Sequence, residues 1–294
     1  MRAKKLVRTA LILLMFTTQD PLFAQYFEVG ASVGGSNYLG ELSDQQWKIS
    51  GTHGAFGVFG RYNANRFLSF RTGLVRAVVS GSDEHSRRTT NVERNLNFRS
   101  NLMELSLIGE INLSPYNVRA YKTAVPYLFA GVAGFHFHPQ AQMRGAWYDL
   151  RPARTEGVLY RQFAFSVPFG FGLKFSLSEK VNLGLELGVR KTFTDRLDDV
   201  SESYPDVMAI RSTDPLAAAL SYRTPELTGT FGENPYGLPR GDASNTDWYM
   251  MGALHVSVNL TDKFGLDFDP RYEPFKKKPV KRRRTADSQE VKRF

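Results

Sequence analysis

The chain has 294 residues and no cysteine, which excludes a disulfide-stapled fold, a thiolate metal site and a cysteine nucleophile. Its formal net charge is +9, but the first 24 residues contribute +3 of this and residues 264–294 contribute +5. The body between them carries only +1. The composition therefore predicts no basic nucleic-acid-binding face and no nucleic-acid partner.

The first residues have the order of a secretory signal peptide. Basic residues in the first eight positions precede a short apolar run at 10–16, and Leu22, Phe23 and Ala24 offer a cleavage site. The run is too short for a membrane-spanning helix, which needs about 20 residues. We expect residues 1–24 to be a signal peptide that directs export through the Sec pathway.

Apolar and polar residues then alternate with a period of two. Every odd position from 163 to 177 is apolar, whereas the even positions are mostly small or polar. Successive side chains of a strand point to opposite faces, and a tilted strand of about 9–11 residues crosses a bilayer. The pattern thus predicts membrane-spanning strands. Eight such segments are present, at residues 26–37, 54–62, 67–79, 99–113, 125–137, 162–177, 181–193 and 247–260.

The connections between these segments alternate between long and short. The short ones are 63–66, 114–124 and 178–180, and the long polar ones are 38–53, 80–98, 138–161 and 194–246. Outer-membrane barrels have short periplasmic turns and long extracellular loops. The sequence therefore predicts an all-β fold, an eight-stranded antiparallel transmembrane β-barrel at residues 25–263. We expect four long extracellular loops, periplasmic termini and an outer-membrane location.

Several charged residues are predicted to face the interior of this barrel. Eight strands enclose a space that side chains can fill, so a diffusion pore is not expected. Buried charges in a closed barrel must be neutralised, and we interpret these residues as a structural ion-pair network. A proton path or a catalytic carboxylate pair is the alternative. The residues are Glu28, Arg71, Glu104, Glu110, Lys174, Glu186 and Arg190, together with Arg61.

Two histidine motifs could carry chemistry. His136 and His138 could form half of a metal site, but no third or fourth ligand can be assigned, and we expect them to face the lumen or the membrane interface. His255 and Ser257 resemble the residue pair of the lipid A deacylase barrels. The alternation places both in the lumen and in the periplasmic half, away from an ester in the outer leaflet. We therefore expect no enzyme activity, no metal and no cofactor.

Asp195, Asp198 and Asp199 form an acidic group at the start of the last long connection. Carboxylates at this spacing could ligate calcium, but the segment lacks the glycine and the terminal glutamate of a known calcium loop. The favoured interpretation is a loop cap or a salt bridge to Arg190 or Lys191.

Residues 264–294 form a basic tail that contains several prolines. In an exported protein such a disordered periplasmic arm is expected to contact peptidoglycan, anionic lipid headgroups or an acidic partner protein. Its positive charges cluster at Lys276, Lys277, Lys278, Lys281, Arg282, Arg283 and Arg284.

Ordered motifs give the chain a family resemblance. They are GSNYLGEL at 35–42, NLNFRSN at 95–101, PYLFAG at 126–131, FHFHPQA at 135–141, RKTFTDRLDDVS at 190–201 and DWY at 247–249. With these motifs the chain resembles the PorG-like outer-membrane barrel component of the type IX (Por) secretion system of Bacteroidetes. The resemblance covers most of residues 25–260, and the basic tail is a departure from it.

The resemblance implies a non-enzymatic structural or assembly component of the secretion and gliding machinery. Its partners would then be outer-membrane lipid and a periplasmic ring that consists of a lipoprotein and its partner. Two other classes stay open: a stand-alone structural or surface-binding barrel, and a channel or lipid-modifying enzyme.

Overall fold

The computed structural model describes residues 26–43, 51–116, 124–178 and 180–260. The predicted signal peptide, most of the turn 114–124 and the basic tail with its lysines and arginines lie outside the described residues. No helix in the described ranges is long and apolar enough to cross a membrane.

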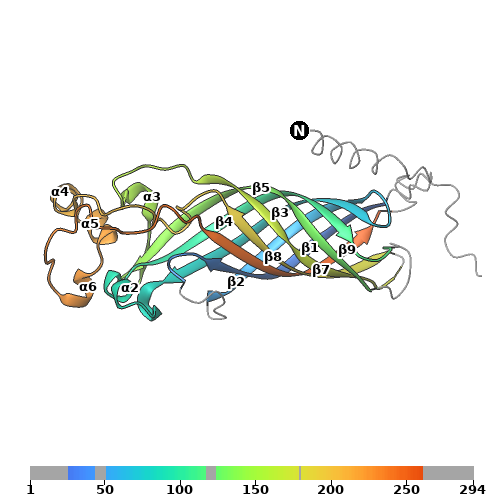
Figure 1. Ribbon diagram of the computed structural model, residues 1–294, viewed down its shortest axis with the longest axis horizontal. Coiled ribbons are helices and arrows are strands. Elements are labelled where there is room, and N and C mark those ends of the chain that lie inside the picture. The colour runs from blue at the N-terminus through green and yellow to red at the C-terminus, as the bar shows by residue number, and fades with distance from the viewer. Residues whose placement is uncertain (1–25, 44–50, 117–123, 179, 261–294) are drawn as a thin grey trace, which may run out of the picture.

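The described chain is a closed, elongated antiparallel barrel of eight long strands (Figure 1). Neighbouring strands in the sequence pair with each other, β4 pairs with β5, and the first and last strands pair to close the barrel. The predicted eight-stranded fold is thereby confirmed. The barrel strands are β1 (Tyr26–Leu39), β2 (His53–Asn63), β3 (Leu68–Ser82), β4 (Asn97–Asn112), β5 (Ala124–Met143), β7 (Phe163–Ser176), β8 (Val181–Thr192) and β9 (Trp248–Asn259).

The strands are staggered as they go round the barrel. The paired positions that begin at Tyr127 pass through all eight strands and return to β5 at Phe137, ten residues further on. Such a stagger requires the strands to tilt, by roughly 35–45° in barrels generally. The interior is consequently narrow, and side chains from opposite walls can meet.

One predicted boundary was wrong. Residues 138–161 were expected to be a loop, but β5 continues to Met143 and turns back through β6 (Ala146–Asp149), which pairs with it. The alternation continues past residue 137, because Ala141 and Met143 still point inward and are buried. Polar residues on the outer face, from His138 to Gln142, conceal this continuation in the sequence.

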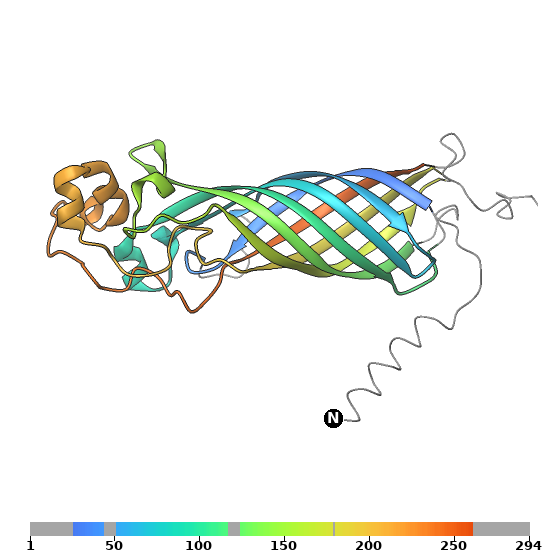
Figure 2. The same ribbon diagram turned by 90° about the horizontal axis from the view of Figure 1, so that it is seen from above.

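The two ends of the barrel differ strongly. We call the end with short connections the turn end and the other the loop end. The described ends of the chain meet at the turn end, where Glu28 lies opposite Asn259. The loop end carries η2 (Asp83–His85), α2 (Thr89–Arg94), α3 (Leu150–Ala153), α4 (Val207–Thr213), α5 (Pro215–Ser221) and α6 (Pro225–Thr228), and Figure 2 shows α4 to α6 beyond the ends of the strands.

The outer face of the barrel is apolar. Leu105 and Phe165 are each 61% exposed and Leu185 is 50% exposed, whereas Glu104 and Glu110 are fully buried in the interior. Apolar residues thus point outward and polar residues inward along the strands, and Arg61 in β2 and Arg71 in β3, which were predicted to face the interior, are buried there. A continuous apolar surface of this kind is the mark of a barrel that spans a bilayer.

The outward position of Leu185 gives the first prediction. We expect Leu185→Arg to destabilise the folded barrel by about 2–4 kcal/mol, because a charge near the bilayer midplane has this cost in membrane barrels. The measurement is the urea midpoint of the barrel refolded into vesicles. Leu185→Met serves as the control for the change of shape. Equal midpoints for the Arg and Met variants would mean that Leu185 does not face lipid.

Candidate functional site

The predicted interior charges meet in one layer near the turn end, which we call the lumen network: Glu28, Arg61, Arg71, Glu110, Lys174 and Glu186. Glu110 is its centre. Its carboxylate lies 2.6 Å from the Lys174 Nζ and 3.0 Å from the Nε atoms of Arg61 and Arg71. Arg61 also donates to Glu28 at 2.8 Å, and Arg71 donates to Glu186 at 2.6 Å. The lumen network thus holds three cations and three carboxylates.

A second charged pair lies nearer the loop end. Glu104 and Arg190 are buried with 3.5 Å between the Glu104 Oε2 and the Arg190 Nε, and the Tyr249 hydroxyl donates to the same Glu104 oxygen at 2.5 Å. Between this pair and the lumen network is a cavity of about 40 Å³, which is room for a few water molecules at most. The predicted ion-pair residues therefore fill the lumen and block it.

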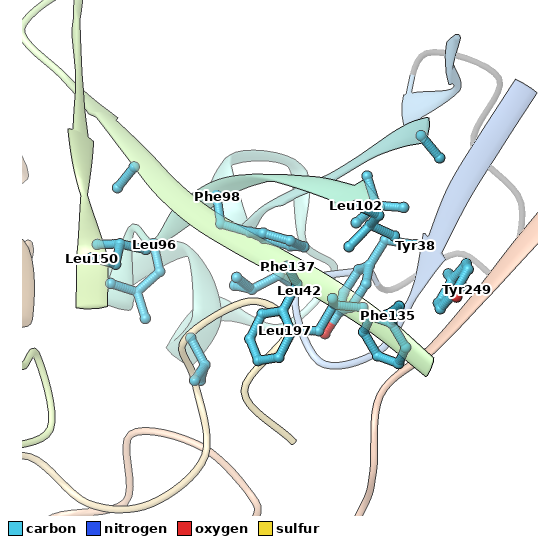
Figure 3. Close-up of a cluster of buried hydrophobic side chains, with 14 of the residues drawn as sticks. Tyr38, Leu42, Leu96, Phe98, Leu102, Phe135, Phe137, Leu150, Leu197 and Tyr249 are labelled. Atoms are coloured by element: carbon cyan, nitrogen blue, oxygen red, sulfur yellow. The ribbon is translucent and has the colours of Figure 1, made fainter. Parts of the chain in front are cut away.

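Above these charges, buried apolar side chains close the barrel. We call this cluster the loop-end core, and Figure 3 shows how its rings converge from several strands. Leu197, from the β8–β9 connection, is fully buried in it beside Phe137 and Tyr38. Tyr38 and Tyr249 continue the inward alternation of their strands, but in the sequence they stood out only as parts of the family motifs. Leu197 shows no such alternation because it comes from a loop.

The predicted acidic group of Asp195, Asp198 and Asp199 lies against this core. Its partners are not the predicted Arg190 and Lys191. The Tyr38 hydroxyl lies 2.7 Å from the Asp198 Oδ2 and 2.5 Å from the Asp247 Oδ1, and all three side chains are buried. A hydroxyl has one hydrogen to donate. One of the two carboxyl groups must therefore carry a proton for both contacts to be hydrogen bonds.

Burial raises the pKa of these carboxyl groups. The pKa of Asp198 is raised to about 7, and that of Asp247 is raised well above its ordinary value, with the charge of Asp198 adding to the effect. The pKa of Asp195 is raised to about 8, first by burial. A protonated carboxyl group beside Tyr38 is thus consistent with the geometry.

Asp199 binds a different set of partners. Thr155 and Tyr160 donate to its carboxylate, Tyr160 at 2.6 Å, and the Arg240 guanidinium donates to its backbone carbonyl at 2.5 Å. Arg240 also donates to Glu156 at 3.0 Å. Of the two predicted roles of the acidic group, the salt bridge to Arg190 or Lys191 is wrong, because Arg190 contacts Glu104 in the lumen and Lys191 lies over the Trp248 ring. The loop cap is present, since Asp198 accepts from the Val200 N–H at 2.9 Å. The acidic residues also tie the β5–β7 and β8–β9 connections together.

The two histidine motifs are accounted for by other contacts. His136 and His138 lie on the outer face, so of the two expected positions, the lumen and the membrane interface, the lumen is excluded. His138 contacts Asp149 at 2.8 Å, and no group of three metal-ligating residues is found in the described ranges. His255 and Ser257 are buried in the lumen as expected, where Ser257 donates to Glu28 at 2.7 Å and His255 lies 3.8 Å from Glu186.

The loop end also holds an open cleft of about 620 Å³ between α2 and the β8–β9 connection. Tyr204 and Tyr222 form an edge-to-face pair in its wall, with ring centroids 5.6 Å apart. Arg88, Asn91 and Glu93 also line it, and in the described part of the chain their side chains have no ion pair. The cleft was not foreseen, because its walls come from loops that are far apart in the sequence.

Fold and interior together define the class of protein: a membrane-spanning β-barrel whose lumen is filled by ion pairs and closed by an aromatic core. The chain belongs to a family described as a domain of unknown function (DUF6089), whose model matches residues 4–240. The comparison with curated proteins gives no match.

Several solved bacterial barrels are similar to this chain. OprG of Pseudomonas aeruginosa is 11% identical with a TM-score of 0.39, over 81% of this chain and 96% of that chain. Neisserial surface protein A is 11% identical with a TM-score of 0.36, over 79% and 96%. Ail of Yersinia pestis, in complex with a heparin analogue, is 8% identical with a TM-score of 0.36, over 80% and 97%. At these scores the likenesses carry no inference about function.

Proposed function

We propose that this protein is a non-enzymatic outer-membrane barrel that acts as a structural or assembly component of the type IX secretion and gliding machinery. The proposal rests on the sequence motifs that resemble this component. In it the loop end is extracellular, and the turn end faces the periplasm, where the ring of a lipoprotein and its partner would be bound.

The filled lumen is the structural observation that carries the proposal. The lumen network and the loop-end core fill the barrel on either side of a cavity of about 40 Å³, which is too small for a transported substrate to pass. A barrel that conducts nothing acts through its surfaces. The surfaces available are the lipid-facing wall, the loop end and the turn end.

The turn end has a rigid surface that suits a contact with a periplasmic partner. The Asn65 side chain accepts from the backbone N–H groups of Phe67 and Leu68, both at 2.8 Å, and so fixes the β2–β3 turn. The next connection is tied to this turn, because the Tyr116 N–H donates to the Arg66 carbonyl at 2.8 Å. The β2–β3 turn and the described start of the next connection, up to Tyr116, thus form one surface, and the exposed Arg66 lies on it.

Genetic deletion tests the function. Loss of the whole protein is expected to block export of type IX substrates and any gliding, which is measured by the appearance of those substrates in the medium. Arg66→Glu should weaken co-purification of the periplasmic ring at least about fivefold, whereas Arg88→Glu at the loop end should not. Normal export in the deletion strain would contradict the proposal.

The basic tail is a second proposed contact with the ring or with peptidoglycan. Removal of residues 264–294 should lower ring co-purification most at low salt, because contacts of exposed charges are screened as ionic strength rises. Unchanged co-purification at every salt concentration would assign the contact to the turn end alone.

The open cleft favours one other candidate function, a stand-alone barrel that binds a ligand at the cell surface. Normal export after deletion, combined with loss of binding to a surface ligand when Tyr204 and Tyr222 are changed to alanine, would support this candidate.

A further inference from the structure

The outer face of β2 to β7 changes from apolar to polar toward the loop end. Residues directly opposite one another on neighbouring strands form rows across this face. One row on β2, β3, β4, β5 and β7 is entirely apolar or glycine: Val58, Leu74, Leu105, Gly134 and Phe165. The row two residues nearer the loop end contains Phe56, Arg76, Met103, His136 and Phe163. Polar groups thus begin within the row that starts at Phe56.

Above that row, the outer face of β4 and β5 is polar. Asn101 lies opposite His138, and Arg99 lies opposite Gln140. On the other side of the barrel, apolar and charged side chains share the rim. There Trp248 lies opposite Lys191 on the outer face, and Phe193 just beyond β8 is 63% exposed.

Two of these outward residues are arginines with no carboxylate partner among the described residues. Arg76 is exposed between Phe56 and Met103. The Arg99 guanidinium lies 3.9 Å from the centre of the Trp147 ring and donates to Gln140 at 3.1 Å, while its buried Nε has no hydrogen-bond partner. The carboxylate on this face is that of Asp149, which accepts from His138 and Gln140.

A cation that faces lipid is unfavourable unless it reaches the headgroups or an anionic partner. Arg76 has apolar neighbours on both sides, and Arg99 is held in place by its stacking on Trp147. Guanidinium groups bind phosphate by paired hydrogen bonds, and stacking on a ring keeps such a group in position. At the rim of a barrel, cations of this kind bind phosphorylated lipid headgroups.

We propose that Arg76, Arg99, Asn101, His136 and His138 form a binding site for the phosphate groups of a phosphorylated glycolipid in the outer leaflet. The site rests on the proposed outer-membrane location, with the loop end outside, but not on the secretion role. The acyl chains would lie on the apolar wall formed by Leu74, Leu105 and Phe165, and the phosphates would lie between the two arginines.

Native mass spectrometry of the purified barrel with diphosphoryl lipid A tests the proposal. The wild-type protein should retain this lipid, and Arg76→Gln combined with Arg99→Gln should weaken its retention at least about tenfold. Lys191→Gln is the matched control, because Lys191 is an outward cation near the same rim that has the Trp248 ring as its partner, 5.6 Å away. We expect it to change retention less than twofold.

Three further arms test whether the phosphate groups, the acyl chains and the two arginines are all needed for binding. The wild type should retain dephosphorylated lipid A as weakly as the double variant retains diphosphoryl lipid A. Inorganic pyrophosphate should not bind, because it has no acyl chains. Arg76→Leu, which matches its apolar neighbours, should fold normally in a heat-modifiability gel and still lose affinity.

Three results would overturn the site. The wild type could retain diphosphoryl and dephosphorylated lipid A equally, Lys191→Gln could lose as much lipid retention as the double variant, or pyrophosphate could bind tightly. A protein bound at this face in place of lipid would overturn it too. Substrate export does not enter the assay, so its outcome is independent of the proposed function.

Discussion

Replacement of Glu110 by glutamine is expected to destabilise the barrel by about 3–5 kcal/mol, because removal of one partner from a buried ion pair leaves an uncompensated charge. Glu110 is fully buried and contacts Arg61, Arg71 and Lys174. Glutamine keeps the shape but removes the charge, so the lumen network would hold three cations and two carboxylates. The measurement is the urea midpoint of the barrel refolded into vesicles.

Two comparisons separate the effect of the lost charge from other effects of the Glu110→Gln substitution. Glu202→Gln removes an exposed partner of Arg196, at 2.7 Å in the folded protein, and should change stability by no more than about 1 kcal/mol because exposed pairs are screened by water. Lys174→Met added to Glu110→Gln restores the balance of charge and should recover part of the loss. A Glu110→Gln midpoint equal to that of the wild type would show that the network does not depend on charge neutrality.

The strands and their two faces could be predicted because each depends on a local pattern. Alternate residues of a strand face lipid and lumen. Glu28, Glu110 and Lys174 could therefore be assigned to the lumen without knowledge of their partners. Glycines weakened the pattern in β2 for a physical reason. A Cβ atom at Gly57 would lie 2.7 Å from the Ser32 Oγ, so the crowded interior favours glycine there over an apolar side chain.

The loop end could not be predicted in the same way. Its contacts join residues that are far apart in the sequence, as in the link from Tyr38 to both Asp198 and Asp247. The acidic group was recognised as a motif, but its partners Thr155, Tyr160 and Arg240 come from other segments with no periodic pattern. The short helices of the β8–β9 connection were missed because the whole connection was interpreted as one polar loop, although α5 (Pro215–Ser221) is rich in alanine and leucine. Tertiary contacts, not local preference, determine this part of the fold.

The β8–β9 connection is expected to open more often as the pH rises from 5 to 8.5. The pKa of Asp195 is raised to about 8, that of Asp198 to about 7 and that of Asp199 to about 6, in each case first by burial. Glu41 and Glu156 add negative charge near these groups, whereas Arg94 and Arg240 oppose it.

The sign of the effect follows from proton binding. The ordinary pKa of an aspartate is close to 4, so between about pH 4 and the raised values the closed connection binds more protons than the open one. Stability of the closed form is then complete below the ordinary pKa and is lost as the pH rises through the raised values. At pH 8.5 Asp198, whose pKa is raised to about 7, is ionised, so only Asp247 is left to carry the proton that allows both to hydrogen-bond to Tyr38.

Hydrogen exchange of residues 194–246, corrected for the intrinsic effect of pH, measures this opening. We expect protection to fall at least about tenfold between pH 5 and pH 8.5, while the barrel strands keep theirs. Asp195→Asn and Asp198→Asn should flatten the dependence, because an amide does not titrate and needs no proton to be neutral. Asp206→Asn is the matched control: Asp206 is exposed and caps α4 through the Ala209 N–H at 3.0 Å, and asparagine caps a helix equally well. Protection that stays constant or rises with pH in the wild type would mean that the buried carboxyl groups are ionised in the closed form, and that the shared proton at Tyr38 does not hold this connection in place.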